Sequence, residues 1–281
     1  MNQPFAHTIL LSDLDGTLIP RGGRVSEGNR AAVERFVAGG GRFGVATGRT
    51  PEAAGGYVSG LPIGAPSVFF NGAMLYDWAE KRVLAERPLP GGDAWPRFAE
   101  RCLAKFPEAC IEVYTATDCN IVSNPENDDP RLPHEYYRYR HVALEEVSDI
   151  AQTPWLKFFV RDTPEHLRQL EREAAEAGIP ELAHGFYSEV EYYEFVAQGT
   201  SKGAMLEAIR TLPEYQGWRI IALGDERNDV EMLRNADIGI CAGGARAEVR
   251  AAADVVGCPV EDDLVAWVLD HVLADEAVAR H

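Results

Sequence analysis

The sequence lacks several features that would assign it to common classes of protein. Its 281 residues include five cysteines, which are scattered and nowhere form a C-x-x-C pair, so neither a disulfide framework nor a zinc site is indicated. Its apolar runs have the length of strands and end in charge, so no membrane span or secretory signal is recognisable. We therefore expect a cytoplasmic enzyme or binding protein with reduced cysteines.

Basic residues are scarce relative to acidic ones. The chain has 27 Lys and Arg against 44 Asp and Glu, a net charge of −17, which argues against a nucleic-acid backbone as partner. A protein of this charge needs a metal ion or a few placed cations to bind an anionic substrate. The 46% hydrophobic fraction excludes a mostly disordered chain, and the length suits one large domain or two ordinary ones.

Predicted strands and helices alternate over the first 75 residues. The clearest helix spans 27–38, where Ser26 can cap its start and three glycines follow its end. A second helix opens at Thr50, with proline at its first position. Strands are predicted before, between and after these helices, at residues 8–12, 42–48 and 66–73. Strands separated by single helices indicate βαβ units, and hence a parallel sheet with helices on both faces.

The last 85 residues resume this pattern, whereas the segment between them mixes helices with alternating, aromatic-rich strands. We therefore predict an α/β fold in two parts. Residues 1–85 and 197–281 form a Rossmann-like parallel sheet core with helices on both faces, and residues 86–196 form an inserted α/β domain. An insertion whose ends lie close together is physically easy to accommodate.

Polar residues and glycines follow the predicted core strands where those strands end, which is where open α/β sheets bind ligands. Together with Lys202, in the first turn of a later helix, they are Asp13, Asp15, Thr47, Gly48, Arg49, Asn71, Gly72, Gly224, Asp225, Asn228 and Asp229. Four acids at one edge would repel one another unless a cation lies among them. A magnesium ion with oxygen ligands fits that place.

These residues resemble the motif series of the haloacid dehalogenase superfamily. The matching motifs are Asp-Leu-Asp-Gly-Thr at 13–17, Thr47, Lys202 and Gly224-Asp225-x-x-Asn228-Asp229. The phrases ATGR, NGA and TSKG, with a large insert, resemble its Cof-type branch, which comprises mostly sugar-phosphate phosphatases with an α/β cap. One departure is Glu226, where that branch commonly has a small residue; it adds a charge near the ligands without disturbing them.

The resemblance implies roles for the acids of the first motif. Asp13 attacks phosphorus in line and forms an aspartyl-phosphate, which splits hydrolysis into two displacements. Asp15 protonates the departing alkoxide and later takes a proton from water. Gly16 lets the backbone approach the phosphoryl group closely. The presence of Asp15 favours a phosphatase or phosphomutase over a phosphonatase or an ATP-driven pump.

The same resemblance implies the remaining site residues. The metal ligands are Asp13, the Asp15 backbone carbonyl, Asp225 and, through water or by orienting its neighbours, Asp229. The phosphoryl oxygens are bound by Thr47, Lys202, Gly16 and Asn228. For Asn71 and Asn228, substrate contact and helix or turn capping remain alternatives. Arg49 either reaches the substrate or anchors the core to the cap.

The segment HEYYRYRH, residues 134–141, stands out within the acidic insert, which has 22 acidic and 11 basic residues. Aromatic faces and guanidinium groups suit a sugar ring or a second anion, which makes Arg138 and Arg140 candidate substrate contacts. The alternative is an amphipathic segment that packs its tyrosines on the cap.

The sequence therefore predicts a magnesium-dependent phosphatase for small phosphorylated metabolites, with sugar phosphates favoured and neither nucleic acid nor membrane as partner. One alternative is a phosphomutase of the phosphomannomutase type, which would transfer phosphate between two sugar positions. Another is a phosphometabolite-binding protein with a vestigial site. The sequence assigns neither the natural substrate nor the oligomeric state.

Overall fold

The computed structural model describes residues 3–130, 139–143, 146–147 and 153–274. The chain divides into two compact units, which we call the core unit (Met1–Ala85 with Ser201–His281) and the insert unit (Glu86–Thr200). Residues 197–200 lie with the insert unit, because the strand Tyr192–Ala197 belongs to its sheet and the Thr200 N–H donates to the Ala197 carbonyl. Arg138, a predicted substrate contact, lies outside the described residues.

A parallel sheet forms the centre of the core unit. Among the described residues it has five strands in the order β14-β13-β12-β1-β2, so β1 lies between strands from the two ends of the chain. In the order of the chain the strands are β1 (Thr8–Ser12), β2 (Arg42–Val45), β12 (Arg219–Gly224), β13 (Ile238–Cys241) and β14 (Val255–Val256). Every residue of β1 is buried, which explains why its sequence is an almost continuous apolar run.

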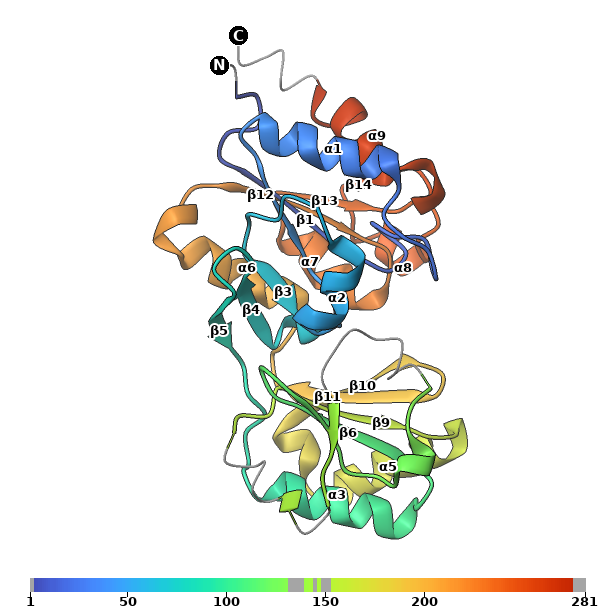
Figure 1. Ribbon diagram of the computed structural model, residues 1–281. Helices are drawn as coiled ribbons and strands as arrows, with labels where there is room; N and C mark the ends of the chain where they lie inside the picture. The colour runs from blue at the N-terminus through green and yellow to red at the C-terminus, as the bar shows by residue number, and fades with distance from the viewer. Residues whose placement is uncertain (1–2, 131–138, 144–145, 148–152, 275–281) are drawn as a thin grey trace. The chain divides into compact units, whose positions relative to one another are not determined.

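Helices cover both faces of this sheet (Figure 1). On one face α1 (Glu27–Ala38) packs against α9 (Leu264–His271), and on the other α6 (Lys202–Thr211) packs against α7 (Val230–Asn235). The shorter helices of the unit are α2 (Pro51–Val58) and α8 (Ala247–Arg250). The predicted Rossmann-like core with helices on both faces is thus confirmed.

Helix starts follow the local capping signals of the sequence. The Ser26 hydroxyl accepts the Asn29 N–H at the start of α1, and the Thr50 hydroxyl accepts the Ala53 N–H at the start of α2. Ser201 caps α6 in the same way, through the Ala204 N–H. This cap fixes the first turn that carries Lys202, so the local sequence sets the position of a predicted site residue.

The third predicted strand differs from the expectation. Residues 66–73 were expected to form a third parallel strand, but only Ser67–Phe69 is a strand (β3), and it pairs antiparallel with β4 (Met74–Asp77), which precedes β5 (Arg82–Glu86). A parallel bridge between Ala46 and Val68 links β3 to the end of β2. The chain reverses after Phe69 because the next two residues, Phe70 and Asn71, both adopt left-handed conformations.

The insert unit is a mixed sheet with helices on one face. In its described part the strand order is β10-β11-β9-β6-β7-β8, antiparallel except for β7 and β8. The strands are β6 (Cys110–Tyr114), β7 (Cys119–Ile121), β8 (Tyr139–His141), β9 (Lys157–Arg161), β10 (Ala183–Glu189) and β11 (Tyr192–Ala197). Two helices, α3 (Ala94–Lys105) and α5 (Pro164–Glu176), pack on it around a core that includes Trp95, Phe98, Phe158 and Phe195.

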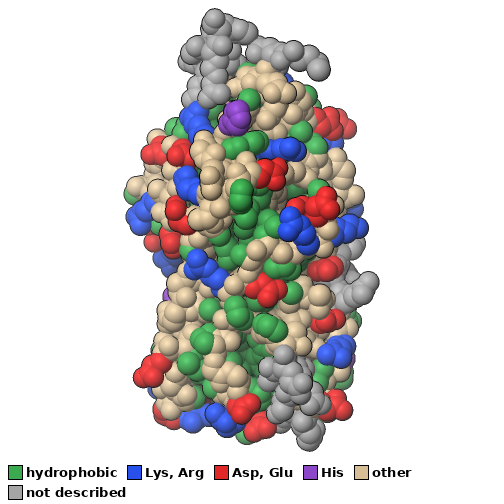
Figure 2. All heavy atoms as spheres, turned by 90° about the vertical axis from the view of Figure 1, so that its left-hand side faces the viewer, with side chains coloured by type: hydrophobic (Ala, Val, Ile, Leu, Met, Phe, Trp, Pro, Cys, Tyr) green, Lys and Arg blue, Asp and Glu red, His purple; other side chains and the backbone are tan. Residues whose placement is uncertain are grey.

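The surface is mixed in charge on the face shown in Figure 2, where acidic and basic side chains are interspersed among the described residues. Within the described parts of the chain, no helix combines the length and the apolar character needed to cross a membrane.

Candidate active site

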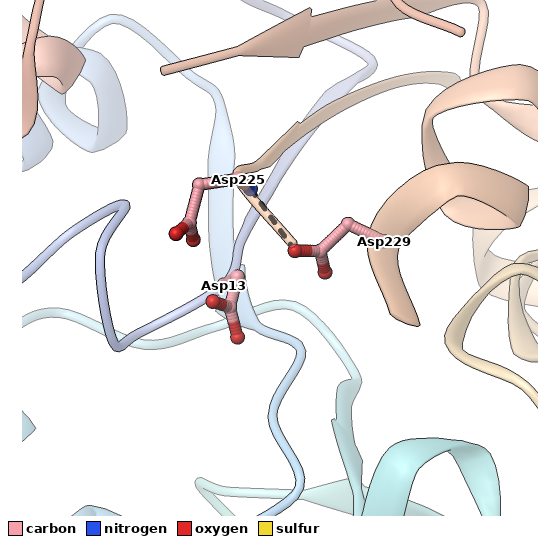
Figure 3. A group of neighbouring side chains, drawn as sticks. All are labelled: Asp13, Asp225 and Asp229. Atoms are coloured by element: carbon pink, nitrogen blue, oxygen red, sulfur yellow. Dashed lines mark hydrogen bonds between the residues drawn. The ribbon is translucent and has the colours of Figure 1, made fainter. Parts of the chain in front are cut away.

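Three aspartates meet at the carboxyl edge of the core sheet (Figure 3). Asp13 follows β1, Asp225 follows the neighbouring strand β12, and Asp229 ends the short 3₁₀ turn Arg227–Asp229. One carboxylate oxygen from each lies within 4.8 Å of the others. Because β1 and β12 are parallel neighbours, their ends coincide, and residues more than 200 positions apart come together.

Lys202 lies among these acids. Its Nζ donates to Asp13 Oδ1 and to Asp229 Oδ1, each at 2.7 Å, and the residue is only 1% exposed. Burial alone would lower the pKa of this lysine, but the two carboxylates outweigh it and raise the pKa above its usual value. Lys202 is therefore a fixed positive charge at the edge of the sheet.

Asp229 organises the backbone around Asp225. Its Oδ2 accepts the N–H groups of Asp225 and Glu226 at 3.0 and 3.1 Å, while its other oxygen is held by Lys202. Both of its oxygens thus have protein donors, and the residue is fully buried. The geometry makes Asp229 the anchor of the turn that aims Asp225.

Gly16 and Thr17 bring the first loop against Asp225. Gly16 has a φ of +90°, and a Cβ there would lie 2.2 Å from Asp225 Oδ2, so a larger residue would displace that carboxylate. The Thr17 hydroxyl donates to Asp225 Oδ1 at 2.7 Å. The two residues after Asp15 therefore set the distance between the Asp13 loop and the Asp225 loop.

The charge of this cluster is unbalanced. Burial raises the pKa of Asp13 well above its ordinary value, although Lys202 opposes the shift. Burial, with a smaller contribution from Asp229, raises the pKa of Asp225 to about 6 against the hydrogen bond from Thr17. Oxygen donors with excess negative charge are what a hard divalent cation requires, so the residues present fit Mg²⁺.

Thr47 follows β2, the neighbour of β1 in the sheet, and its hydroxyl is oriented by the backbone. The Arg49 N–H donates to Thr47 Oγ1 at 3.2 Å, which leaves the hydroxyl hydrogen to donate elsewhere. The residue is 2% exposed, and its own N–H is held by the Val68 carbonyl at 2.8 Å. The end of β2 therefore presents a hydroxyl donor on a rigid backbone.

Asn71 is held in a left-handed conformation, with a φ of 55°. Its N–H donates to the Thr47 carbonyl at 3.1 Å, and its Oδ1 accepts the Asn228 side-chain N–H at 3.0 Å. A Cβ on Gly48 would lie 2.9 Å from Asn71 Nδ2. A non-glycine residue in this conformation costs about 1–3 kcal/mol, and such strain clusters at functional sites.

Arg49 forms an ion pair with Asp15 that sequence reasoning missed. Its Nε donates to Asp15 Oδ2 at 2.8 Å and its Nη2 donates to Asp15 Oδ1 at 3.0 Å. The two residues follow neighbouring strands, β1 and β2, which was the signal that could have revealed the pair. Neither predicted role for Arg49, a substrate contact or an anchor to the cap, includes this contact to Asp15.

Glu226 is tied to the rim of the core by two arginines. One Glu226 oxygen lies 3.0 Å from Arg21 and the other lies 3.2 Å from Arg246. Its charge is thus offset locally.

Arg140 lies in β8 of the insert unit and is exposed. Its Nε donates to Asn120 Oδ1 on β7 at 2.8 Å. Asn120 and Arg140 are cross-strand partners, so this contact supports the sheet of the insert unit itself.

Residues 10–269 match the haloacid dehalogenase-like hydrolase family. The match covers nearly the whole chain, so the chain belongs to this family, and the resemblance inferred from its motifs is confirmed.

Two curated proteins illustrate the relationship. Pyridoxal phosphate phosphatase YbhA of Escherichia coli is 25% identical over 280 residues, covering 94% of this chain and 98% of that protein. The Arabidopsis thaliana protein named endoribonuclease YBEY, chloroplastic, is 24% identical over 270 residues, or 92% of this chain. The chain spans only 45% of that longer protein, so a name given to the whole is not carried over.

A solved structure shares the fold over the same extent. A haloacid dehalogenase-like hydrolase from Bacteroides thetaiotaomicron superimposes with a TM-score of 0.82 at 25% identity, covering 94% of this chain and 99% of the other. The insert unit as well as the core unit is therefore part of the shared architecture.

Proposed function

We propose that this chain is a magnesium-dependent phosphatase that hydrolyses small phosphorylated metabolites through an aspartyl-phosphate at Asp13. The observation that carries the proposal is the buried group formed by Asp13, Lys202 and Asp225 at the carboxyl edge of the sheet. The excess negative charge of this group would repel a phosphate dianion, so Lys202 and a bound Mg²⁺ together would let the Asp13 carboxylate approach phosphorus.

In the first step the Asp13 carboxylate attacks phosphorus, the bond to the leaving oxygen breaks, and Asp15 gives that oxygen its proton. In the second step Asp15 takes a proton from water, whose oxygen attacks phosphorus. The bond to Asp13 then breaks and inorganic phosphate departs. Each residue thus returns to its starting state, as turnover requires.

The remaining site residues act on the charge of the phosphoryl group. Lys202 supplies a fixed cation, Thr47 supplies a hydroxyl donor, and the backbone at Gly16 allows close approach. Asn228, bonded to Asn71, is a further donor in this scheme. Asp13, the Asp15 carbonyl and Asp225 would hold Mg²⁺, with Asp229 orienting them, and the ion would neutralise charge on the phosphoryl oxygens.

The substrate class rests on the family and on its named relatives. The Escherichia coli relative is named for a small phosphorylated metabolite, pyridoxal phosphate. We assign the selection of the leaving group to the insert unit, and sugar phosphates are the first class to test.

The experiment is a phosphate-release assay on a panel of sugar phosphates and other phosphorylated metabolites, with Mg²⁺ or with excess chelator. The proposal requires release of inorganic phosphate that depends on Mg²⁺ and needs no bisphosphate activator. Transfer of phosphate between positions of one sugar, or full turnover in chelator, would overturn it.

A further inference from the structure

The pair between Arg49 and Asp15 is bidentate. Two different guanidinium nitrogens each reach a different oxygen of the same carboxylate, at 2.8 and 3.0 Å. Such a fork fixes the plane of the carboxylate as well as its position. A lysine or a single hydrogen bond would fix the position alone.

The Asp15 side chain needs a contact from another residue to keep a fixed orientation. It lies in the loop after β1, and its side chain is 41% exposed, whereas Asp13 next to the strand is buried. A proton donor that is free to rotate spends little time aimed at the leaving oxygen, and a misplacement of about 1 Å can cost about 100-fold in rate.

Arg49 is itself held by the core unit. Its guanidinium stacks over the Tyr57 ring, 4.5 Å from the ring centre, and its side chain is only 20% exposed. Its backbone N–H binds the Thr47 hydroxyl, and its carbonyl accepts the Phe70 N–H at 3.2 Å. The support for Asp15 is therefore built from the segments that follow β2 and β3 and from helix α2.

The bidentate contact also leaves Asp15 able to donate and accept a proton. A carboxylate has about four lone-pair sites, and Arg49 takes one on each oxygen. Each oxygen thus keeps a second site at which a proton can be carried to a leaving group or taken from water.

We propose that Arg49 is a positioning residue that aims Asp15 at the leaving oxygen. The inference rests on the proposed function, in which Asp15 transfers that proton. Its consequence is a dependence on the leaving group: esters of poor leaving groups need the proton and so need Arg49. An aryl ester whose phenolate departs unprotonated does not need it for the first step.

The test compares kcat/KM of the Arg49→Ala variant for an alkyl phosphate and for p-nitrophenyl phosphate, with Mg²⁺ present. We expect a loss of about 100-fold for the alkyl ester and of no more than about threefold for the aryl ester. For the aryl ester kcat should fall together with KM, because the second step still needs Asp15 as base. Retained kcat/KM on the aryl ester also proves that the variant is folded.

Three further variants sharpen the test. Arg49→Lys keeps the charge without the fork and should recover little of the lost alkyl activity. Asp15→Asn combined with Arg49→Ala should be no slower on the alkyl ester than Asp15→Asn alone, because one residue acts through the other. Arg35→Ala removes an exposed arginine that pairs with Asp270 and should change neither ester.

The possible failures are distinguishable. An equal loss on both esters would mean that Arg49 acts on the phosphoryl group, and would overturn this inference. Full recovery by Arg49→Lys, or additive losses in the double variant, would also overturn it. If Asp15→Asn itself keeps alkyl activity, the acid role in the proposed function fails instead.

Discussion

Each unit of this protein buries a lysine among acids. Comparing the two arrangements distinguishes a candidate ligand site from a cluster that supports the fold. In the core unit Lys202 bridges Asp13 and Asp229 at the edge of a sheet. In the insert unit Lys157 lies on the face of a sheet, 3.4 Å from Glu194 and 4.6 Å from the centre of the Tyr114 ring.

The two clusters differ in how many buried acids each has for its one lysine. In the insert unit Glu194 pairs with Lys157, and the buried Glu112 accepts the Tyr114 hydroxyl. In the core unit one ammonium is shared by two acids, and burial raises the pKa of the third, Asp225, to about 6. The core cluster thus has three carboxylates for one ammonium at the edge of a sheet, whereas the insert cluster has two for one on the face of a sheet. The larger acidic excess, at the edge where open α/β sheets bind ligands, marks the core cluster as the candidate ligand site.

The largest expected effect comes from the attacking acid. Asp13→Asn keeps the volume of the side chain but removes its charge, so turnover should fall by more than about a thousandfold. Steady-state phosphate release measures it. The matched change in the insert unit, Glu194→Gln, should leave turnover of p-nitrophenyl phosphate within about twofold. If Asp13→Asn kept a tenth of the activity, the core cluster would not have the catalytic role that sets it apart from the insert cluster.

The second prediction concerns stability, and here the large effect is expected from the cluster of the insert unit. Glu194→Ala leaves Lys157 buried without its carboxylate, so the insert unit should lose about 3–5 kcal/mol of stability. Urea unfolding followed by tryptophan fluorescence measures the loss, since Trp95 and Trp155 lie in the core of that unit. The double variant Lys157→Met with Glu194→Leu should recover most of it. A Glu194→Ala protein as stable as wild type would show that the Lys157–Glu194 pair does not support the fold of the insert unit.

The third prediction concerns the metal. Mg²⁺ at about 100 times its dissociation constant should stabilise the core unit by about 2.7 kcal/mol, and Asp225→Ala should remove most of that response. Thermal melting with and without Mg²⁺ measures it, and Asp237→Ala, an exposed acid of the same unit, serves as a surface-acid control. An undiminished Mg²⁺ response in Asp225→Ala would place the metal elsewhere.

The smallest effect is the dependence of this response on pH. Because the pKa of Asp225 is raised to about 6, a proton competes with the metal below that pH, and apparent affinity should fall about tenfold per pH unit there. The metal-free fold binds this proton more tightly than the unfolded chain does. Its stability should therefore decline as pH rises from about 4 to about 6, and Mg²⁺ should restore it. Isothermal titration between pH 5 and 8 measures the affinity; an affinity independent of pH would contradict the charge imbalance.

Much of the core could be predicted because its signals are local. Ser26 and Thr50 cap helices where the sequence indicates, and the helix at 27–38 ends at the predicted glycines. The convergence of Asp13 and Asp225 was predictable too, because neighbouring parallel strands end at one edge.

Other features depend on contacts that a sequence does not display. The reversal after Phe69 needs left-handed conformations at Phe70 and Asn71; asparagine adopts this conformation more readily than most residues, but phenylalanine does not. The fork between Arg49 and Asp15 joins side chains from two loops whose directions are set only in the folded protein. Single residues could thus be placed at the edge of the sheet, and the strand order brings Arg49 and Asp15 near one another, but the two-point geometry of their contact could not be predicted.

The most direct test of the account is to trap the intermediate. The Asp15→Asn variant should release one equivalent of nitrophenol from p-nitrophenyl phosphate and then stall, because the first step needs no acid and the second lacks its base. Borohydride reduction followed by mass spectrometry should then find the modified side chain at Asp13, and nothing in the Asp13→Asn protein. A modified side chain at any other residue, or steady turnover in Asp15→Asn without a phosphorylated Asp13, would contradict the account.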